Sequence, residues 1–361
     1  MILNPAVLKI ELLCLGAHAA EDIDRGRKGG AGPAGGQYFV LPGNVVVNVP
    51  LQGRFVENSP FTILKGDKGY SLYKNQKFLA KVEIVPRPKF YEKFTSDGTP
   101  MWKIALLHGR DCLASTVSQR CVYWRENRQC LFCGIELSLK YGTTTEFKTP
   151  QQLSEVASEA VKEGVVKHVT LTTGTVPSPD KGAVILAEAT LGIKKDTSLH
   201  VHVQLEPPTD LKYIELLHKA EADTIGIHIE SFDPEVRSRV CPAKPAMDSF
   251  VSAWEIAVDL FGAGQVSSMI IAGLGESDES IIQGAEILAR MGVVPLLVPL
   301  RPIIGTPLED VRPPSPERMI SLYMKLGEIL RTFGENILEN KAGCVRCGGC
   351  SALGDVLIFG V

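Results

Sequence analysis

The alternation of strand-like and helix-like segments constrains the fold of this chain more than any other feature. From about residue 102 onward, short β-prone runs alternate with longer segments of helical period, which is typical of βα units around a parallel sheet. We expect strands near residues 103–107, 168–172, 199–205, 224–229, 266–271 and 294–298. We expect helices at residues 151–163, 181–189, 211–220, 247–261, 277–291 and 316–333. About six βα units are fewer than the eight of a closed barrel, so we predict an α/β fold with a partial (βα)6 TIM-like barrel, open on one side.

The helix expected at residues 151–163 has the clearest boundaries. Thr149 is suited to cap its amino end, Pro150 to occupy its first position, and Gln152 to complete a capping box. Gly164 is suited to end it.

The rest of the chain divides into two smaller parts. Residues 1–100 carry short β-prone runs at 45–49, 61–64 and 78–85, which predict a small β-rich N-terminal domain. We interpret the glycine-rich stretch 29–36 as a linker or mobile loop. The barrel is expected over residues 101–312, and residues 313–361 form a C-terminal extension with a helix and a cysteine motif.

Charge and targeting signals exclude several classes of partner. The formal net charge is -3 and no Lys/Arg run resembles a nucleic-acid or lipid footprint, so we expect neither nucleic acid nor membrane as a partner. The apolar stretch 6–17 contains Lys9 and Glu11, and it lacks both a basic leader and a spanning length. We therefore expect a cytoplasmic protein.

Six of the nine cysteines lie in two tight triplets, which indicates metal binding and not a disulfide framework. Cys121, Cys130 and Cys133 form a Cys-x8-Cys-x2-Cys motif in a loop before the first long helix. Three thiolates on a cluster of four irons leave one iron free for an exogenous ligand. The alternative is a structural zinc site, which normally has four closed ligands.

These residues resemble the radical S-adenosylmethionine (SAM) superfamily, in which three loop cysteines hold a [4Fe-4S] cluster whose fourth iron chelates SAM. The usual spacing is Cys-x3-Cys-x2-Cys, so this chain has a wider first gap. The resemblance implies that Phe132, just before the third cysteine, contacts the adenine. It also implies that Thr172, Thr173 and Gly174 meet the SAM amino group, although the family's usual glutamate is absent there.

Further SAM contacts follow from the same resemblance over residues 102–310. The segment 226–237 resembles the strand and loop that contact the ribose and carboxylate, with Glu230 and Arg237 as candidates. Gly273 and Gly275 resemble the late-strand glycine motif beside the adenine. We expect Glu230, and also Glu206 at the rim after a strand, to act in catalysis, while a structural role for Glu206 stays open.

The second triplet is Cys344, Cys347 and Cys350, in the Cys-x2-Cys-x2-Cys spacing of ferredoxin-type loops. We expect an auxiliary [4Fe-4S] cluster. Its fourth ligand is open between Cys112, Cys241, a substrate and an exogenous sulfur species. The alternatives are a zinc knuckle and a disordered thiol tail.

The implied chemistry is reductive cleavage of SAM to a 5'-deoxyadenosyl radical that removes a hydrogen atom from a substrate C-H bond. Residues 299–309 resemble the late barrel of biotin synthase-like enzymes, including class II lipoyl synthases and the nitrilase-cluster-associated family. With the second triplet, this predicts a sulfurtransferase that inserts sulfur into an octanoylated carrier protein. Expected partners are ferredoxin or flavodoxin and a second radical SAM protein. The alternatives are rearrangement, methylation or C-C chemistry on a small metabolite, and a non-catalytic zinc protein.

Overall fold

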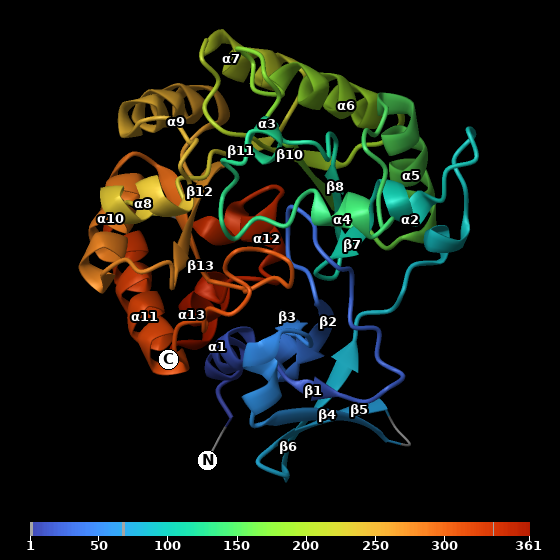
Figure 1. Ribbon diagram of the computed structural model, residues 1–361, viewed down its shortest axis with the longest axis vertical. Coiled ribbons are helices and arrows are strands. Elements are labelled where there is room, and N and C mark those ends of the chain that lie inside the picture. Colours follow the sequence, from blue (N-terminus) through green and yellow to red (C-terminus); the bar gives the residue numbers. More distant parts are fainter. Residues whose placement is uncertain (1–2, 67–68, 335) are drawn as a thin grey trace.

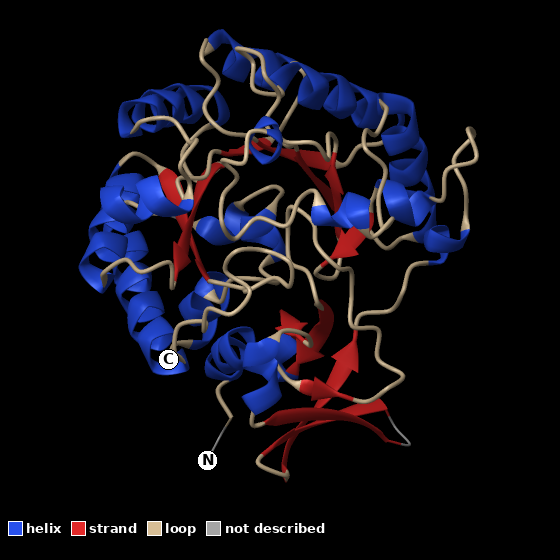
Figure 2. Cartoon of the chain, viewed as in Figure 1, coloured by secondary structure: helices blue, strands red, loops and turns tan. Residues whose placement is uncertain are grey.

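The computed structural model describes residues 3–66, 69–334 and 336–361, which contain two separate sheets. Figure 1 shows a curved sheet enclosed by helices, with a smaller sheet beside the open side of the curve. Figure 2 shows the strands of the larger sheet as an arc whose outer face is covered by helices. The predicted α/β fold with a partial barrel is confirmed.

The curved sheet has seven strands, of which six are parallel and lie in the order in which they follow along the chain. They are β8 (Cys112–Thr116), β9 (His168–Thr172), β10 (His200–Gln204), β11 (Thr224–Gly226), β12 (Val266–Ala272) and β13 (Val293–Pro299). The main covering helices are α5 (Pro150–Glu163), α6 (Ala183–Asp196), α7 (Lys212–Lys219), α9 (Met247–Phe261), α10 (Asp278–Arg290) and α11 (Pro316–Phe333). The capping box of Thr149 and Gln152 is present, and Gly164 ends α5 in a left-handed conformation. Shorter helices lie in the loops: α3 (Val122–Arg125), α4 (Leu137–Lys140) and α8 (Pro234–Val240).

The strand expected near residues 103–107 is wrong. Residues Met101–Ile104 form the short helix α2, and Leu106–His108 form β7, which pairs antiparallel with β8 through a tight turn. Gly109, in that turn, has a φ of 58°. The apolar run thus belongs to an edge hairpin. The first parallel strand is β8, whose small and polar residues give a weak strand signal in the sequence.

Residues of the barrel strands alternate between an outer face packed beneath the helices and an inner face turned to the cavity. On β9, Val169 and Leu171 are buried in the core cluster beneath the helices. Thr170 and Thr172 instead line an internal cavity. The barrel therefore encloses a cavity in place of the packed core of a closed TIM barrel, with polar residues beside β9 and apolar residues beside β12 and β13.

The N-terminal sheet has six strands in the order β1-β4-β5-β6-β2-β3. They are β1 (His18–Ala19), β2 (Gly36–Leu41), β3 (Val45–Pro50), β4 (Phe61–Gly66), β5 (Gly69–Lys74) and β6 (Lys77–Ile84). The β-prone runs of the sequence form β3, β4 and β6. One face of the sheet buries a separate apolar cluster that includes Phe39, Val47, Phe61 and Ile63.

Helix α1 (Pro5–Leu15) joins this sheet to the barrel. Leu8 and Leu12 pack in the cluster of the small sheet, whereas Ile10 packs in the barrel core. Lys9 is 1% exposed, and its Nζ lies 2.5 Å from Asp355 Oδ2 and 2.7 Å from the carbonyl oxygen of Gly348. The apolar N-terminal stretch is thus an interior helix; no described helix has the length and apolar character to cross a bilayer.

The glycine-rich stretch packs against the barrel, so its interpretation as a linker is wrong. The amide of Gly30 donates to the carbonyl oxygen of Gly134 at 2.8 Å, directly after the first cysteine motif. A Cβ on Gly29 would lie 2.6 Å from Leu137 Cβ. The absence of side chains lets this segment approach the cysteine loop closely.

The C-terminal extension is ordered and enters the barrel. After α11 the chain forms α12 (Cys344–Cys347), which lies within the curve of the sheet in Figure 1. Helix α13 (Leu353–Phe359) then packs against α1 and α11. The disordered-tail alternative for the second triplet is therefore wrong.

Candidate functional site

One cavity of about 350 Å³ occupies the barrel interior and its mouth. Both cysteine triplets line it. Apolar walls come largely from the last strands, through Met269, Ile271, Leu296 and Val298. The site therefore combines two groups of thiols with an apolar surface.

Neighbouring loops hold the first cysteine motif by backbone hydrogen bonds. The amide of Val122 donates to Thr175 O at 2.8 Å, and the amide of Leu131 donates to Val240 O at 2.9 Å. The amide of Cys121 donates to Glu136 Oε1 at 3.0 Å. The loop after β9, the end of helix α8 and Glu136 of the same segment thus fix a motif that has little regular structure of its own.

The three thiols of this motif lie close enough to influence one another. Burial, together with the nearby Cys130 and Cys121, raises the pKa of Cys133 to about 12. Cys130 differs because a hydrogen bond from Cys241 lowers its pKa. Cys241, one of the open candidates for the second triplet, therefore lies beside the first.

Phe132, Thr172, Thr173 and Gly174 all line the cavity. A Cβ on Gly174 would lie only 2.1 Å from the carbonyl oxygen of Arg120, just before Cys121. Glycine is required at this position because the loop after β9 lies directly against the cysteine loop. The structure thus brings together the motifs that the sequence assigned to the cluster and to SAM.

Glu230 and Lys244 form a buried ion pair at the cavity wall. Lys244 Nζ lies 2.7 Å from Glu230 Oε1, and the side chains are 11% and 10% exposed. Burial alone would lower the pKa of Lys244, but Glu230 and the nearby Cys130 raise it. Glu230 Oε2 is buried and has no partner among the described residues, and Glu230 has a left-handed φ of 68°. A strained residue with a free carboxylate oxygen is suited to ligand binding.

Glu206 also lines the cavity, where it contacts Tyr123. Tyr123 donates its hydroxyl proton to Glu206 Oε1 at 2.7 Å, and Lys181 Nζ is 3.9 Å from the same oxygen. Burial raises the pKa of Glu206, and the hydrogen bond from Tyr123 opposes that rise. The carboxyl group is therefore suited to exchange a proton inside the cavity.

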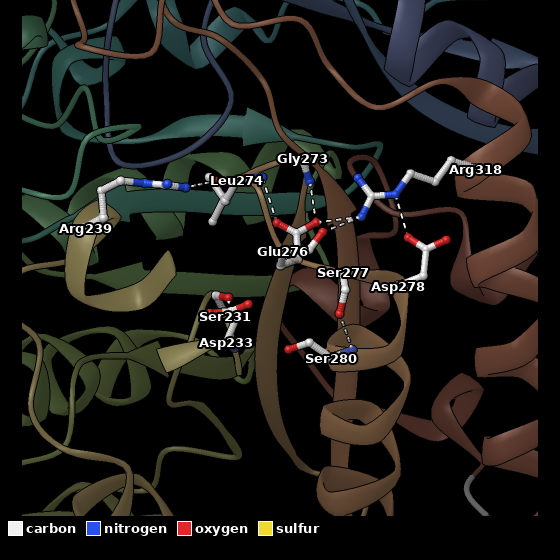
Figure 3. Close-up of polar contacts among 10 residues, drawn as sticks. All are labelled: Ser231, Asp233, Arg239, Gly273, Leu274, Glu276, Ser277, Asp278, Ser280 and Arg318. Atoms are coloured by element: carbon white, nitrogen blue, oxygen red, sulfur yellow. Dashed lines mark hydrogen bonds and ion pairs between the residues drawn. The ribbon is translucent and has the colours of Figure 1, made fainter. Parts of the chain in front are cut away.

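Arg237, Gly273 and Gly275 are not brought to the cavity. Arg237 Nη1 lies 3.9 Å from Met247 Sδ. Figure 3 shows the glycine turn after β12 closed by its own carboxylate: Glu276 accepts the amides of Gly273 and Leu274, each at 2.8 Å. Arg318 pairs with Glu276 at 2.9 Å. The donors of this turn are thus used within the fold.

The second triplet lies deeper, inside the barrel. Gln204 Nε2 donates to Cys344 Sγ at 3.2 Å, from the end of β10. Cys112, from β8, donates a hydrogen bond to Cys347 that lowers the pKa of Cys347. A Cβ on Gly343 would lie 2.4 Å from the ring of His202, so α12 enters the barrel against the strand interior.

Positive charges surround the second triplet. Burial raises the pKa of Cys350 to about 11, against the influence of Arg301, Lys9 and Arg27. Arg301 donates to Asn48, a residue of β3, through Nη1 and through Nη2, the latter at 2.6 Å from Asn48 O. The hydroxyl of Tyr38 is buried without a hydrogen-bond partner among the described residues. The N-terminal sheet thus contributes directly to this end of the cavity.

Comparison with known families identifies the barrel. Residues 125–288 match the family model described as the radical SAM superfamily. Residues 125–288 therefore form a radical SAM domain. The matched region includes Cys130, Cys133, Glu206 and Glu230, but neither Cys121 nor the second triplet.

Individual radical SAM relatives are distant. Bacteriochlorophyllide c C-7(1)-hydroxylase of Chlorobaculum limnaeum is 23% identical over 293 residues, which cover 73% of each protein. The solved structure of methylornithine synthase covers 69% of this chain and 70% of its own, with 18% identity and a TM-score of 0.49. The hydrogenase maturase HydG of Carboxydothermus hydrogenoformans covers 62% and 52%, with 20% identity and a TM-score of 0.44.

The donor sets suit the cofactors that the radical SAM superfamily implies. Each triplet supplies clustered thiols, and at the first of them Glu230 retains an unpartnered oxygen beside Lys244. A zinc ion would hold its thiolates about 2.3 Å from a single centre, whereas an iron-sulfur cube binds each thiolate to a different iron. Among the residues the structure describes, no three Cys, His, Asp or Glu side chains form a group that holds one ion. The zinc alternatives gain no support from this arrangement.

Several residues of the radical SAM site carried little signal in the sequence. In the sequence, Tyr123 lies close to Cys121 and Lys244 lies close to Cys241. Their acidic partners, Glu206 and Glu230, are each more than ten positions away. Arg27 and Tyr38 come from the segment before the barrel and line its cavity. His228 also lines the cavity, whereas His202 is a buried strand residue bonded to Thr224 at 2.7 Å. Only the proximity of Tyr123 and Lys244 to the cysteines offered a clue.

Proposed function

We propose that this radical SAM enzyme binds its reducing [4Fe-4S] cluster through Cys121, Cys130 and Cys133. When bound, the cluster and SAM supply a 5'-deoxyadenosyl radical that removes a hydrogen atom from the substrate. The protein then has to hold the substrate C-H bond in place and keep water away from the radical. The mainly apolar cavity wall supports this role, because it favours a substrate with a substantial apolar part.

The amino-acid part of SAM has a matching set of partners. Its ammonium and carboxylate groups need one anionic and one cationic neighbour, and the Glu230 and Lys244 pair offers both beside Cys130. Phe132 is proposed to contact the adenine, and Thr172, Thr173 and Gly174 to border the amino group. Arg237, Gly273 and Gly275 are left out of the proposed SAM contacts because they do not line the cavity.

The proposed reaction is sulfur insertion into an unactivated C-H bond, of the lipoyl type, on an octanoylated carrier protein. The observation that carries it is that both triplets line one cavity, so an auxiliary cluster on Cys344, Cys347 and Cys350 would face the same substrate. We propose that ferredoxin or flavodoxin donates the electrons. We also propose that a second radical SAM protein takes part in the reaction. Glu206 is proposed to exchange a proton with the substrate or product.

Hydroxylation is a second candidate, favoured by the relative named as a hydroxylase, which matches this chain over 73% of its length. In that case the carbon from which hydrogen was removed would lose one further electron, to the oxidised cluster or to a second SAM molecule. The oxygen of water, and not sulfur, would then bond to that carbon with release of a proton. The same cavity and first triplet would serve both reactions.

Anaerobic incubation of the reconstituted enzyme with SAM, dithionite and an octanoyl-lysyl peptide tests the proposal by mass spectrometry. A product heavier by sulfur supports sulfur insertion, and a Cys347→Ala variant should lose that product while still cleaving SAM. A product carrying oxygen from labelled water would instead support hydroxylation. SAM cleavage without any gain of sulfur would reject the lipoyl-type reaction.

A further inference from the structure

We propose that Cys112 is the fourth protein ligand of the second cluster, so that four cysteines hold it and no iron remains open. This inference rests on the proposed function, which assigns an iron-sulfur cluster to Cys344, Cys347 and Cys350. It chooses among the four candidates that the sequence left open for the fourth ligand.

The position of Cys112 carries the first part of the argument. Cys112 begins β8, is 1% exposed, and lies beside Cys347, whose pKa it lowers. Its Sγ also lies 3.3 Å from Thr170 Oγ1 on the inner face of β9. A Cβ on Gly109, three residues earlier, would lie 2.8 Å from Cys347 Sγ. The hairpin before β8 and helix α12 are therefore packed directly together at this thiol.

The other cysteine candidate lies elsewhere. Cys241 follows α8 and donates to Cys130 of the first triplet. Gln204 reaches the second triplet, but its amide donates a hydrogen bond to Cys344 and is not a ligand of iron. Among the described residues, Cys112 is thus the thiol that the fold adds to the second triplet.

The charges around the second triplet provide an independent observation. Arg27 and Arg301 act on Cys350, and their hydrogen bonds go to Pro33 O and to Asn48, without an ion pair to any described carboxylate. Tyr38, which is 7% exposed, lines the cavity with an unpartnered hydroxyl. Two buried cations without a carboxylate partner among the described residues, beside a hydroxyl without a hydrogen bond, indicate that an anionic group belongs in this space.

Four thiolates match this charge better than three. A four-iron core in its common oxidation state carries two positive charges, so four thiolates give the whole centre two negative charges. Arg27 and Arg301 together supply two positive charges to balance them, because Lys9, the third nearby cation, is already paired with Asp355. Three thiolates would leave one of these buried cations without a counter-charge.

The contact between Cys241 and Cys130 does not indicate that Cys241 is a fourth ligand of the first cluster. Around Cys130 the cation Lys244 is accompanied by Glu230 and Glu206, so the surroundings have both signs of charge. A zwitterionic ligand on an open iron suits such surroundings, whereas the charged side chains that act on Cys350 are the cations Arg301, Lys9 and Arg27. A closed second cluster would serve as a reservoir of electrons or sulfide and would not bind substrate at an iron.

The test uses the full chain with Cys121, Cys130 and Cys133 all replaced by Ala, so that the second cluster is the only one expected. After anaerobic reconstitution, iron and sulfide are measured and the EPR spectrum is recorded, before and after adding Cys112→Ala. We expect at least a twofold loss of iron, or conversion of a four-iron signal to a three-iron signal. Cys14→Ala, which removes a buried cysteine of α1, is the matched control and should change neither.

Two outcomes overturn the proposal in distinguishable ways. If adding Cys112→Ala to the triple variant leaves the iron, the sulfide and the EPR signal unchanged, Cys112 is not a ligand. The second cluster itself is then still supported. No iron in the parent triple variant rejects the second cluster itself, and with it the sulfur-insertion proposal. Cys112→Ser, which keeps the size of the side chain, guards against a folding defect; a spectrum identical to the parent's would also reject the ligand.

Discussion

The two thiol groups of this protein differ in where they lie and in the charges around them. The first lies in the loop after β8, above the carboxyl ends of the strands, beside Glu230 and Lys244. The second lies inside the barrel, beside Arg27 and Arg301. Surroundings of mixed charge suit a zwitterionic ligand, and surroundings of positive charge suit a permanently anionic centre. The comparison therefore separates a site that binds a reactant from one that retains a cofactor.

The two groups also depend on different parts of the chain. Backbone bonds from barrel loops, such as Leu131 to Val240, hold the first group. The second is held by segments from outside the barrel: Lys9 binds Gly348 O, and the amide of Asn48 donates to Gly349 O at 2.8 Å. The N-terminal helix and sheet thus stabilise the second group, which gives this additional part of the chain a structural purpose.

The largest effect should come from removing one thiol of each group. Cys130→Ala should reduce formation of 5'-deoxyadenosine to the level without enzyme, because the first group is proposed to hold the reducing cluster. Cys347→Ala should retain SAM cleavage and lose the final product. Chromatography of anaerobic reactions measures both nucleoside and product, and equal loss of SAM cleavage in the two variants would contradict the separation of roles.

Lys244→Gln tests whether the first site recognises a zwitterion. Loss of a hydrogen bond to a charged group costs about 1.5 to 3 kcal/mol, so the Kd for SAM should rise by about tenfold to a hundredfold. Equilibrium binding to the reconstituted protein measures this change. Arg237→Gln is the matched control: its guanidinium faces Met247 outside the cavity, so its Kd should stay unchanged. A larger effect of Arg237→Gln than of Lys244→Gln would favour the assignment made from the sequence.

Arg301→Gln tests the positive surroundings of the second group. Removing a cation destabilises the more negative, reduced form of a cluster, so its reduction potential should become more negative. One charge acting through an effective dielectric constant of about 20 contributes on the order of 1 kcal/mol or more at short range. Redox titration followed by EPR should show a change in the second cluster only; a shift confined to the first cluster would reverse the comparison.

Tyr123→Phe should have the smallest effect. Burial raises the pKa of Glu206, and the Tyr123 hydroxyl opposes this by stabilising the carboxylate. Without that hydrogen bond the pKa rises further, so Glu206 stays protonated to a higher pH. The acidic limb of the pH profile for product formation should move upward, with a few-fold loss of rate near neutral pH. An unshifted profile would show that ionisation of Glu206 does not limit the reaction.

Much of the barrel followed from local sequence patterns. The capping residues Thr149 and Gln152 gave the start of α5, and apolar alternation gave β9. The cysteine spacing likewise indicated clustered metal ligands, because the spacing of thiols in one loop limits what they can bind. The first parallel strand was missed because Cys112–Thr116 is small and polar, and a stronger apolar run lies just before it.

The sequence by itself determined the βα order, the two thiol triplets and the superfamily, because these depend on periodicity and short spacings that are local in the chain. Only the tertiary structure decided that both triplets share one cavity, that Cys112 lies with Cys347 and Cys241 with Cys130, and that Arg27 and Arg301 serve the second group. The physical reason is that these contacts join residues from distant segments. Their proximity depends on how the sheet curves and on how the N- and C-terminal segments pack into its open side.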